Sequence, residues 1–161
     1  MESAKITLRK FIAHAIDREY MSGVSREKSR VKATGEVFTP DALVREMLDK
    51  IQQQNPDAFT NRQKTFCDPS AGDGQFLAHV MLYKLVAGDL SKMKDPAFLD
   101  KDMTVDYHTA LKTVYGVDLM SDNVKEIKNR LGMGYAGFKK TLAKNIVCAN
   151  ALTYDFSFNG K

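Results

Sequence analysis

Cysteine is scarce in this sequence, where two of 161 residues, Cys67 and Cys148, carry a thiol. So few cysteines exclude a small fold that depends on several disulfides. Both lie in short apolar runs, TFC and IVC. These surroundings predict free thiols, buried in a protein of a reducing compartment.

Long hydrophobic runs are absent as well. No stretch approaches the roughly 18 apolar residues that span a bilayer. Charged residues interrupt the first 20 positions, where a signal peptide would need an apolar core. We therefore expect no membrane partner and a cytoplasmic location. The residues that are present, 43% apolar and 27% charged, are typical of one compact globular domain.

Excess positive charge occurs in one region. Residues 1–34 hold eight Lys or Arg against four Asp or Glu, which accounts for the whole formal charge of +4. We expect a basic N-terminal helix and loop at 1–34 and a main domain at 35–161. A basic segment is either a solvated surface or a contact for a polyanion such as DNA. The residues predicted to contact DNA are Arg26, Lys28, Arg30 and Lys32.

The spacing of apolar residues predicts helices that alternate with short strands. Spacings of three and four indicate helices at 6–21, 39–51, 76–86 and 124–131. Thr39 has the position of an N-cap before Pro40 and Asp41. Short apolar runs indicate strands at 65–68, 114–118 and 145–149, and alternation suggests a fourth at 154–158. Loops are expected at 22–36, at 88–110 with some helix near its end, and at 132–138 as a flexible linker.

Strands alternating with helices predict an α/β fold with a parallel sheet and helices on its faces. In such sheets ligands bind beyond the carboxyl ends of the strands. Functional residues are therefore expected at 68–74, 118–120 and 150–152.

The run DPSAGDGQF, at 68–76, is the most distinctive of these segments. Its two glycines allow positive φ and a close approach of a ligand to the main chain. It lacks the Lys-Ser/Thr of a phosphate-binding loop. Asp68 and Asp73 would repel a phosphate and favour a ligand with a positive centre, such as S-adenosylmethionine.

Metal-ligating residues do not cluster in the sequence. His14, His79 and His108 are far apart, and the two cysteines add no ligand spacing. No metal site is predicted, and His79 is expected to be a partly buried or surface residue rather than a base.

Four motifs in order resemble those of class I S-adenosylmethionine-dependent methyltransferases of the DNA adenine-N6 type. They are TGEVFTP at 34–40, DPSAGDGQF at 68–76, YGVDLMSDNV at 115–124 and CANAL at 148–152. The resemblance implies a Rossmann-like methyltransferase fold with a truncated, mostly parallel sheet and an N-terminal helical extension.

The resemblance also implies where S-adenosylmethionine binds. The segment ahead of the first main helix would hold the methionine end, and Asp118 would accept hydrogen bonds from the ribose hydroxyls. Asn150 would contact adenine where the family usually has Asp. The implied cofactor-binding residues are Phe38, Thr39, Asp68, Ser70, Ala71, Gly72, Gly74, Phe76, Asp118, Leu119, Asn150 and Ala151.

The family's catalytic segment, Asp/Asn/Ser-Pro-Pro-aromatic, has no counterpart, because no two of the four prolines are adjacent. We therefore assign no catalytic residue and do not expect this chain alone to methylate DNA. The strand that leads to that segment in the family is missing too, which leaves the first strand on an open edge. We expect a second copy, another subunit or the N-terminal helix to cover this edge.

The leading hypothesis is a methyltransferase-like protein that binds S-adenosylmethionine, as a short form or as the cofactor-binding part of a longer DNA adenine-N6 methylase. One alternative is a non-catalytic partner or regulatory subunit that uses the fold to bind a methyltransferase or nucleic acid. Another is an enzyme that degrades S-adenosylmethionine, for which no residue argues specifically.

Overall fold

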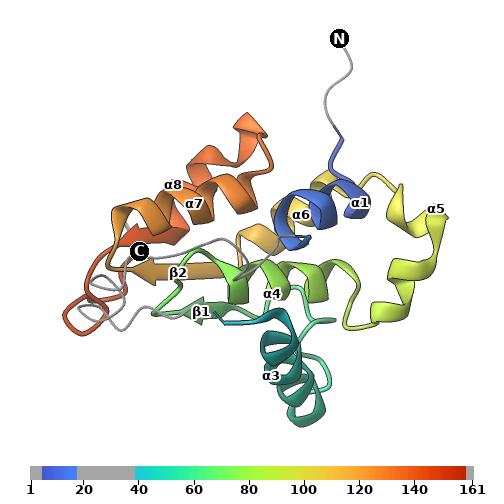
Figure 1. Cartoon of the computed structure of the whole chain (residues 1–161), viewed down its shortest axis with the longest axis horizontal. Coiled ribbons are helices and arrows are strands. Elements are labelled where there is room, and N and C mark those ends of the chain that lie inside the picture. The colour runs from blue at the N-terminus through green and yellow to red at the C-terminus, as the bar shows by residue number, and fades with distance from the viewer. Residues whose placement is uncertain (1–4, 18–38, 159–161) are drawn as a thin grey trace.

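A computed structural model describes residues 5–17 and 39–158 as an α/β fold with a parallel sheet (Figure 1). Three strands lie side by side in the order β1 (Phe66–Asp68), β2 (Val114–Asp118) and β3 (Ile146–Cys148). Phe66 pairs with Val114, and Asp118 pairs with Cys148. The prediction of an α/β fold with a parallel sheet is confirmed.

Helical elements surround the sheet. In chain order the helical elements are α1 (Leu8–Phe11), the π-helical turn η1 (Ile12–Ile16), α3 (Asp41–Gln54), α4 (Gln75–Leu85), the 3-10 turn η2 (Leu90–Lys94), α5 (Pro96–Leu99), α6 (Thr104–Leu111), α7 (Ser121–Gly132), the 3-10 turn η3 (Ala136–Phe138) and α8 (Lys139–Asn145). Three of them, η1, α3 and α6, pack against α4. Within the described ranges, no helix is both long enough and apolar enough to cross a membrane.

The central helix α4 lies directly on the sheet. Nine of its 11 residues are buried, because it contacts β1 and β2 as well as α3 and α6. Gly116 in β2 makes this approach possible, since a Cβ there would lie 2.7 Å from Cδ1 of Leu77. Gln75 begins α4 beside the glycine turn, and Leu85 ends it at the other end of the strands.

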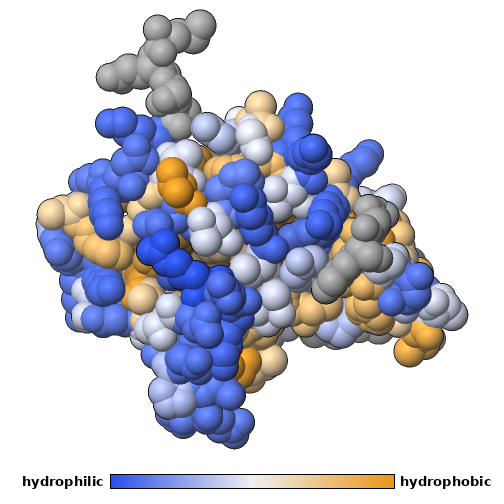
Figure 2. Space-filling view, turned by 180° about the vertical axis from the view of Figure 1, so that it is seen from behind, coloured by the Kyte–Doolittle hydropathy of each residue, from blue (hydrophilic) through white to orange (hydrophobic). Residues whose placement is uncertain are grey.

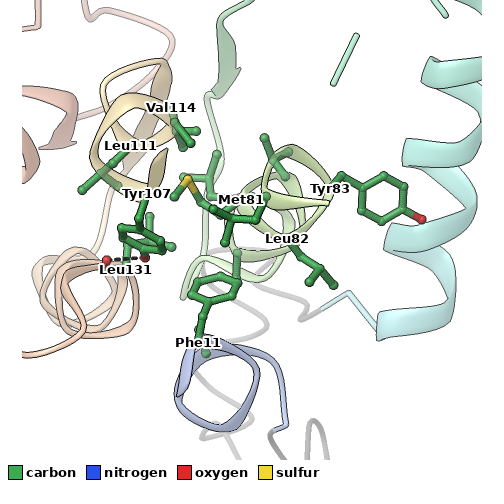
Figure 3. Close-up of a cluster of buried hydrophobic side chains, with 14 of the residues drawn as sticks. Phe11, Met81, Leu82, Tyr83, Tyr107, Leu111, Val114 and Leu131 are labelled. Carbon is green, nitrogen blue, oxygen red and sulfur yellow. Dashed lines mark hydrogen bonds between the residues drawn. The ribbon is translucent and has the colours of Figure 1, made fainter. Parts of the chain in front are cut away.

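The main core joins α1, α4 and α6. Figure 3 shows Phe11, Met81 and Tyr107 converging in one cluster of buried side chains. The Phe11 and Tyr107 rings lie 5.4 Å apart between centroids. The Tyr107 hydroxyl donates a hydrogen bond of 2.5 Å to the carbonyl of Leu131 in α7. Full burial of a side chain as large as Phe11 contributes about 1.5–3 kcal/mol, so α1 shares the core of the sheet domain.

The N-terminal helix differs from the prediction of a helix at 6–21. It begins at Leu8, after Thr7, whose hydroxyl accepts a hydrogen bond from the Lys10 N–H. Asp17 has non-helical backbone angles, and residues 18–21 and the predicted loop at 22–36 lie outside the described residues.

The described N-terminal helix does not cover the open edge of β1, so this one of the three predicted alternatives is wrong, and a second copy or another subunit stays a prediction. α1 packs against α5, and η1 packs against α4 and α7, on the helical side of the sheet (Figure 1). Among the strands of the described chain, β1 pairs with β2 alone.

The start of α3 also differs from its prediction. Pro40, with ψ 150°, is the N-cap, and no side chain caps the helix, so Thr39 does not have this role. Of the predicted apolar face, Val44 and Leu48 are buried, whereas Leu43 and Met47 are exposed. Met47 lines a cavity together with Cys67 of β1. Figure 2 shows mostly hydrophilic side chains over α3, where hydrophobic side chains are few and lie apart from one another.

The segment 88–110 contains more helix than predicted. Its expected helix is α6, but η2 and α5 precede it. Asp89 and Asp95 are the N-caps of η2 and α5, and each accepts a hydrogen bond from the backbone N–H two residues on. The N-cap of α6 is Met103, and Asp102 just before it accepts from the N–H of Thr104. η2 and α5 are too short to show an apolar period.

The segment 132–138 is not a flexible linker, which corrects another prediction. Phe138 is 1% exposed, and its ring lies 5.2 Å from that of Tyr107 and 4.6 Å from that of Tyr135. The chain then forms α8. Asn145, predicted to begin a strand, ends this helix, and its amide donates to the carbonyl of Val114.

The fourth strand predicted at 154–158 is absent from the structure. Phe156 and Phe158 have φ of 55° and 45°, which interrupts the extended backbone a strand needs. Phe158 is buried and its ring lies 4.7 Å from that of Tyr115 in β2. The aromatic tail therefore packs against the sheet without extending it.

Both cysteines are free thiols, as predicted, but both are exposed. The prediction that they are buried is therefore wrong. Cys67 is in β1 and Cys148 ends β3. These are the two edge strands, and an apolar run in an edge strand is not covered on all sides.

Candidate functional site

The sheet brings three of the predicted site segments to one end. Asp68 ends β1, Asp118 ends β2, and Asn150 follows β3. Because the strands are parallel and adjacent, these positions form a row along the carboxyl ends. This is the arrangement predicted from the alternation of strands and helices.

The turn after β1 has the backbone conformation predicted for its glycines. Gly72 has φ +57° and Gly74 has φ +95°. A Cβ on Gly72 would meet no atom within 4 Å, whereas one on Gly74 would lie 3.2 Å from Ile127. Gly72 therefore presents its main chain to open space, and Gly74 allows α7 to approach the start of α4.

Ala71 fixes this turn to the sheet. Its N–H donates to the carbonyl of Val117 in β2 at 2.9 Å. Its side chain is buried, so a ligand at the turn would meet the main chain of Ala71 rather than its methyl group. Ser70 is exposed, and its N–H donates to Asp68.

The carboxylate of Asp118 is held at the end of β2. The residue is 9% exposed. Its oxygens accept from the amide of Asn123 at 3.3 and 3.4 Å, and Oδ1 accepts from the N–H of Met120 at 3.4 Å. A carboxylate fixed in this way is a hydrogen-bond acceptor for hydroxyl groups.

Asp68 lies within electrostatic reach of Asp118. Burial raises the pKa of the Asp68 carboxyl, the Ser70 N–H opposes this, and the negative charge of Asp118 adds to the increase in pKa. Two carboxylates that destabilise each other's charge favour a cation between or beside them.

Four of the predicted residues line one cavity. Thr39, Asp68, Ser70 and Phe76 surround a volume of about 340 Å³, together with Val44, Met47 and Cys67. The cavity lies between α3, the turn and the uncovered edge of β1. Asp118, Leu119, Asn150 and Ala151 are outside its lining, farther along the row of strand ends.

The residues after β2 and β3 are more exposed than those of the turn. Leu119 is 57% exposed. The Asn150 side-chain oxygen accepts from the N–H of Leu152 at 3.0 Å, so this amide stabilises a local turn. Ala151 is half-buried within that turn.

Asp73 does not act as predicted. The sequence suggested that Asp73 and Asp68 together repel phosphate, but Oδ1 of Asp73 lies 3.8 Å from Nη1 of Arg130. This guanidinium is fully buried and offsets the charge of Asp73. The electrostatic preference for a positive ligand therefore depends on Asp68 and Asp118.

Arg130 is the residue of this region that the sequence reasoning missed. Its Nε donates to the carbonyl of Ala15 and its Nη2 to Oε1 of Gln75, both at 2.6 Å. It thereby joins η1 and α7 to the start of α4. Its position three residues after Ile127, on the apolar face of α7, was the signal that could have shown its burial.

His79 is fully buried, not partly buried or at the surface as predicted. Its Nδ1 lies 3.0 Å from the Gln75 carbonyl, and its Nε2 lies 3.9 Å from Oδ1 of Asp41. Burial lowers the His79 pKa, although the nearby Asp41 opposes this. The imidazole therefore belongs to the interior polar network beneath the turn.

Several predicted site residues lie outside the described ranges. They are Phe38 of the cofactor set and Arg26, Lys28, Arg30 and Lys32 of the DNA set. Over residues 5–17 and 39–158, no group of three or more His, Cys, Asp or Glu side chains is placed to hold a metal ion.

Comparison with known proteins gives no relative. No protein-family model matches the chain, and no curated protein matches it.

Proposed function

We propose that this protein binds S-adenosylmethionine at the carboxyl ends of its strands, as the cofactor-binding part of a DNA adenine-N6 methyltransferase with a Rossmann-like fold. One observation carries the proposal. The half-buried carboxylate of Asp68 and the buried carboxylate of Asp118 end adjacent strands, and the turn that follows Asp68 has a positive φ at Gly72. The four ordered sequence motifs support the same ligand.

The residues present fit this cofactor in their chemistry. Asp118 would accept hydrogen bonds from two ribose hydroxyls, and Gly72 leaves space for the ligand beside the main chain. The cavity beside Asp68, Ser70 and Phe76 is placed to receive the methionine portion. Asp68 would stabilise the positive centre there. Burial and the negative charge of Asp118 make the ionised Asp68 carboxylate unfavourable, so a cation beside it would offset this cost.

The proposal covers binding of the cofactor. The methyl group that S-adenosylmethionine supplies would need a target amine held by a Pro-Pro-aromatic segment, and no two prolines of this sequence are adjacent. We therefore propose that this chain orients the cofactor and that another segment or subunit positions the target base.

Calorimetric titration with S-adenosylmethionine and S-adenosylhomocysteine tests the proposal. Saturable binding of both is expected, and Asp118→Asn should weaken both by about tenfold or more, because a charge-assisted hydrogen-bond acceptor is lost. Asp68→Asn should instead reduce the preference for S-adenosylmethionine, which carries a sulfonium charge, over S-adenosylhomocysteine, which does not.

The matched control is Asp100→Asn, which removes the same charge from an exposed residue directly after α5, at the far end of the molecule (Figure 1). Its binding should equal that of the unaltered protein. The proposal is wrong if the folded protein binds neither compound, or if Asp118→Asn binds as tightly as the control.

Among the described residues no strand pairs with the outer edge of β1, which favours a second candidate function, pairing with another polypeptide. Met47 and Cys67 are exposed and line one cavity beside this strand, and an unpaired apolar edge is a template for strand addition. A second copy or a methyltransferase subunit would cover it. Sedimentation velocity over a range of concentrations tests the second copy, and a monomer at every concentration would exclude it.

DNA binding by the basic N-terminal segment stays a prediction from charge. Retention on DNA that weakens with salt and disappears when Arg26, Lys28, Arg30 and Lys32 are all replaced by glutamine would support it. These substitutions leave the buried helix α1 in place, and retention that they do not change would contradict the prediction.

A further inference from the structure

A second cavity lies at the other end of α4 from the glycine turn. It has a volume of about 190 Å³ and is enclosed by three segments, the chain before β1, the end of α4 and the 88–110 segment. The 11 residues of α4 separate the two ends by about 16 Å. This cavity is thus distinct from the proposed cofactor site.

Positive charge surrounds the second cavity. Its lining includes Lys84, Lys92, Lys101 and Arg62, with Asp106 as its acidic member. Arg62 pairs with Asp106 at 3.3 Å. In the part of the chain that the structure describes, none of the three lysines forms an ion pair with a carboxylate. The cavity therefore keeps an excess of positive charge.

The ammonium group of Lys84 is the most confined of these cations. It donates a hydrogen bond of 2.7 Å to the carbonyl of Lys64 and lies 5.2 Å from the centroid of the Phe66 ring. Burial lowers the Lys84 pKa to about 8. A carboxylate or phosphate would offset this loss of hydration, since opposite charge favours the protonated amine.

The remaining walls are largely apolar. Phe59 and Met103 are buried, and Leu85 and Phe98 complete this side. The Met103 N–H donates to the carbonyl of Ile6 at 2.7 Å, which fixes the 88–110 segment to the residues just before α1. Since a cavity of about 150 Å³ accommodates benzene, this one has room for a ring or a short aliphatic group.

We propose that this second cavity binds a small organic anion, with a phosphate or carboxylate head held by Lys84, Lys92 and Lys101 and an aromatic or aliphatic body against Phe59, Phe98 and Met103. The 88–110 segment then forms one wall of a ligand site at the amino ends of the strands. This site does not depend on the proposed cofactor.

Titration of the ¹⁵N-labelled protein followed by NMR tests the proposal, with phenyl phosphate and benzoate as the two anionic probes. Benzyl alcohol supplies the ring without charge, and inorganic phosphate supplies the charge without a ring. Saturable shifts at residues 84–87 and 92–110 are expected with at least one anionic probe. The comparison of phenyl phosphate with benzoate identifies the preferred head group.

Binding of the better anion should exceed that of benzyl alcohol and of inorganic phosphate by about tenfold or more, because both the charge and the ring contribute. Lys84→Met should weaken it by about tenfold. Lys101→Met, at an exposed position that does not affect folding of the core, is the second variant. Lys125→Met removes the same charge from an exposed residue of α7 and should leave binding unchanged.

Three results would overturn the proposal. One is the absence of saturable shifts with either aromatic anion. Another is shifts confined to residues 68–76 or 118–124, which would place the anion at the other end. The third is equal binding by Lys84→Met, Lys101→Met and Lys125→Met, which would show that general surface charge is responsible.

Discussion

At the carboxyl ends of the strands lie the carboxylates of Asp68 and Asp118, whereas the cavity at the amino ends is lined by Lys84, Lys92 and Lys101. α4 joins the two ends, with Gly74 before its first residue and Lys84 in its last turn. A cation in the last turn of a helix is favourable because that end of the helix dipole is negative. The comparison shows that the two ends of one small domain, joined by α4, differ in the sign of their charge.

The two ends also differ in how they are held together. Beneath the glycine turn, the buried guanidinium of Arg130 bonds to Ala15 and Gln75. Around the second cavity, the Arg62–Asp106 pair is 71% and 40% exposed. A buried network fixes its members in one arrangement, whereas exposed side chains adjust to a ligand. We therefore expect a rigid carboxyl end and an adaptable amino end.

The largest expected effect contrasts the two arginines. Arg130→Met should lower the free energy of unfolding by about 3–5 kcal/mol, because it removes one partner from a buried polar network. Arg62→Met should lower it by no more than about 1 kcal/mol. Urea unfolding followed by circular dichroism measures both. Equal losses for the two variants would contradict the difference in rigidity.

A smaller effect is expected within the glycine turn. Gly74→Ala combines a φ of +95° with a contact of 3.2 Å to Ile127, and should cost about 2–3 kcal/mol of stability. Gly72→Ala, with φ +57° and open space around its Cβ, should cost about 1 kcal/mol. The same unfolding measurement compares them. If Gly72→Ala were the more damaging variant, the close approach of α7 would not be what Gly74 provides.

The smallest effect concerns pH at the amino end. The Lys84 pKa is lowered from 10.5 to about 8 by burial, so between these values the unfolded chain binds a proton that the folded chain does not. Stability should therefore rise with pH across this range, by about 1 kcal/mol after allowance for solvent screening. Below about pH 8 the Lys84 amine is protonated in the folded and the unfolded chain, so the full cost of burying its charge then lowers the free energy of unfolding.

Urea unfolding at pH 7.5 and pH 10 tests this dependence, with Lys84→Met as the comparison. The variant lacks the titrating amine, so its gain over the same interval should be smaller than that of the unaltered protein. An identical gain in both would show that the amine of Lys84 is not responsible.

Much of the carboxyl end was predictable because its signals are local. The glycine turn is a contiguous run, and the apolar runs around residues 66, 116 and 147 indicate the strands directly. The alternation of strand and helix then places Asp68, Asp118 and Asn150 together. The Rossmann-like fold, the cofactor and the DNA contact stay predictions.

The amino end could not be predicted in the same way. Its cations come from positions 62, 84, 92 and 101, which no sequence spacing connects before the chain is folded. The exposure of Cys67 and the burial of Phe138 depend similarly on which surfaces meet in three dimensions. The missed helix α8 is short and follows a glycine-rich segment, so its local pattern favours a loop.

The hydrogen bonds that Arg130 donates to the carbonyl of Ala15 and that His14 donates to the carbonyl of Asn129 each join residues 115 positions apart. Closing so large a segment of chain costs conformational entropy before the contact contributes any stability. The surface that receives residues 14 and 15 is complete when α4 and α7 have met. Docking of the N-terminal helix is therefore expected late in folding. Its contacts with α4 and α7 should also be the first to open in the native state, and hydrogen exchange at the amides of this helix would measure that opening.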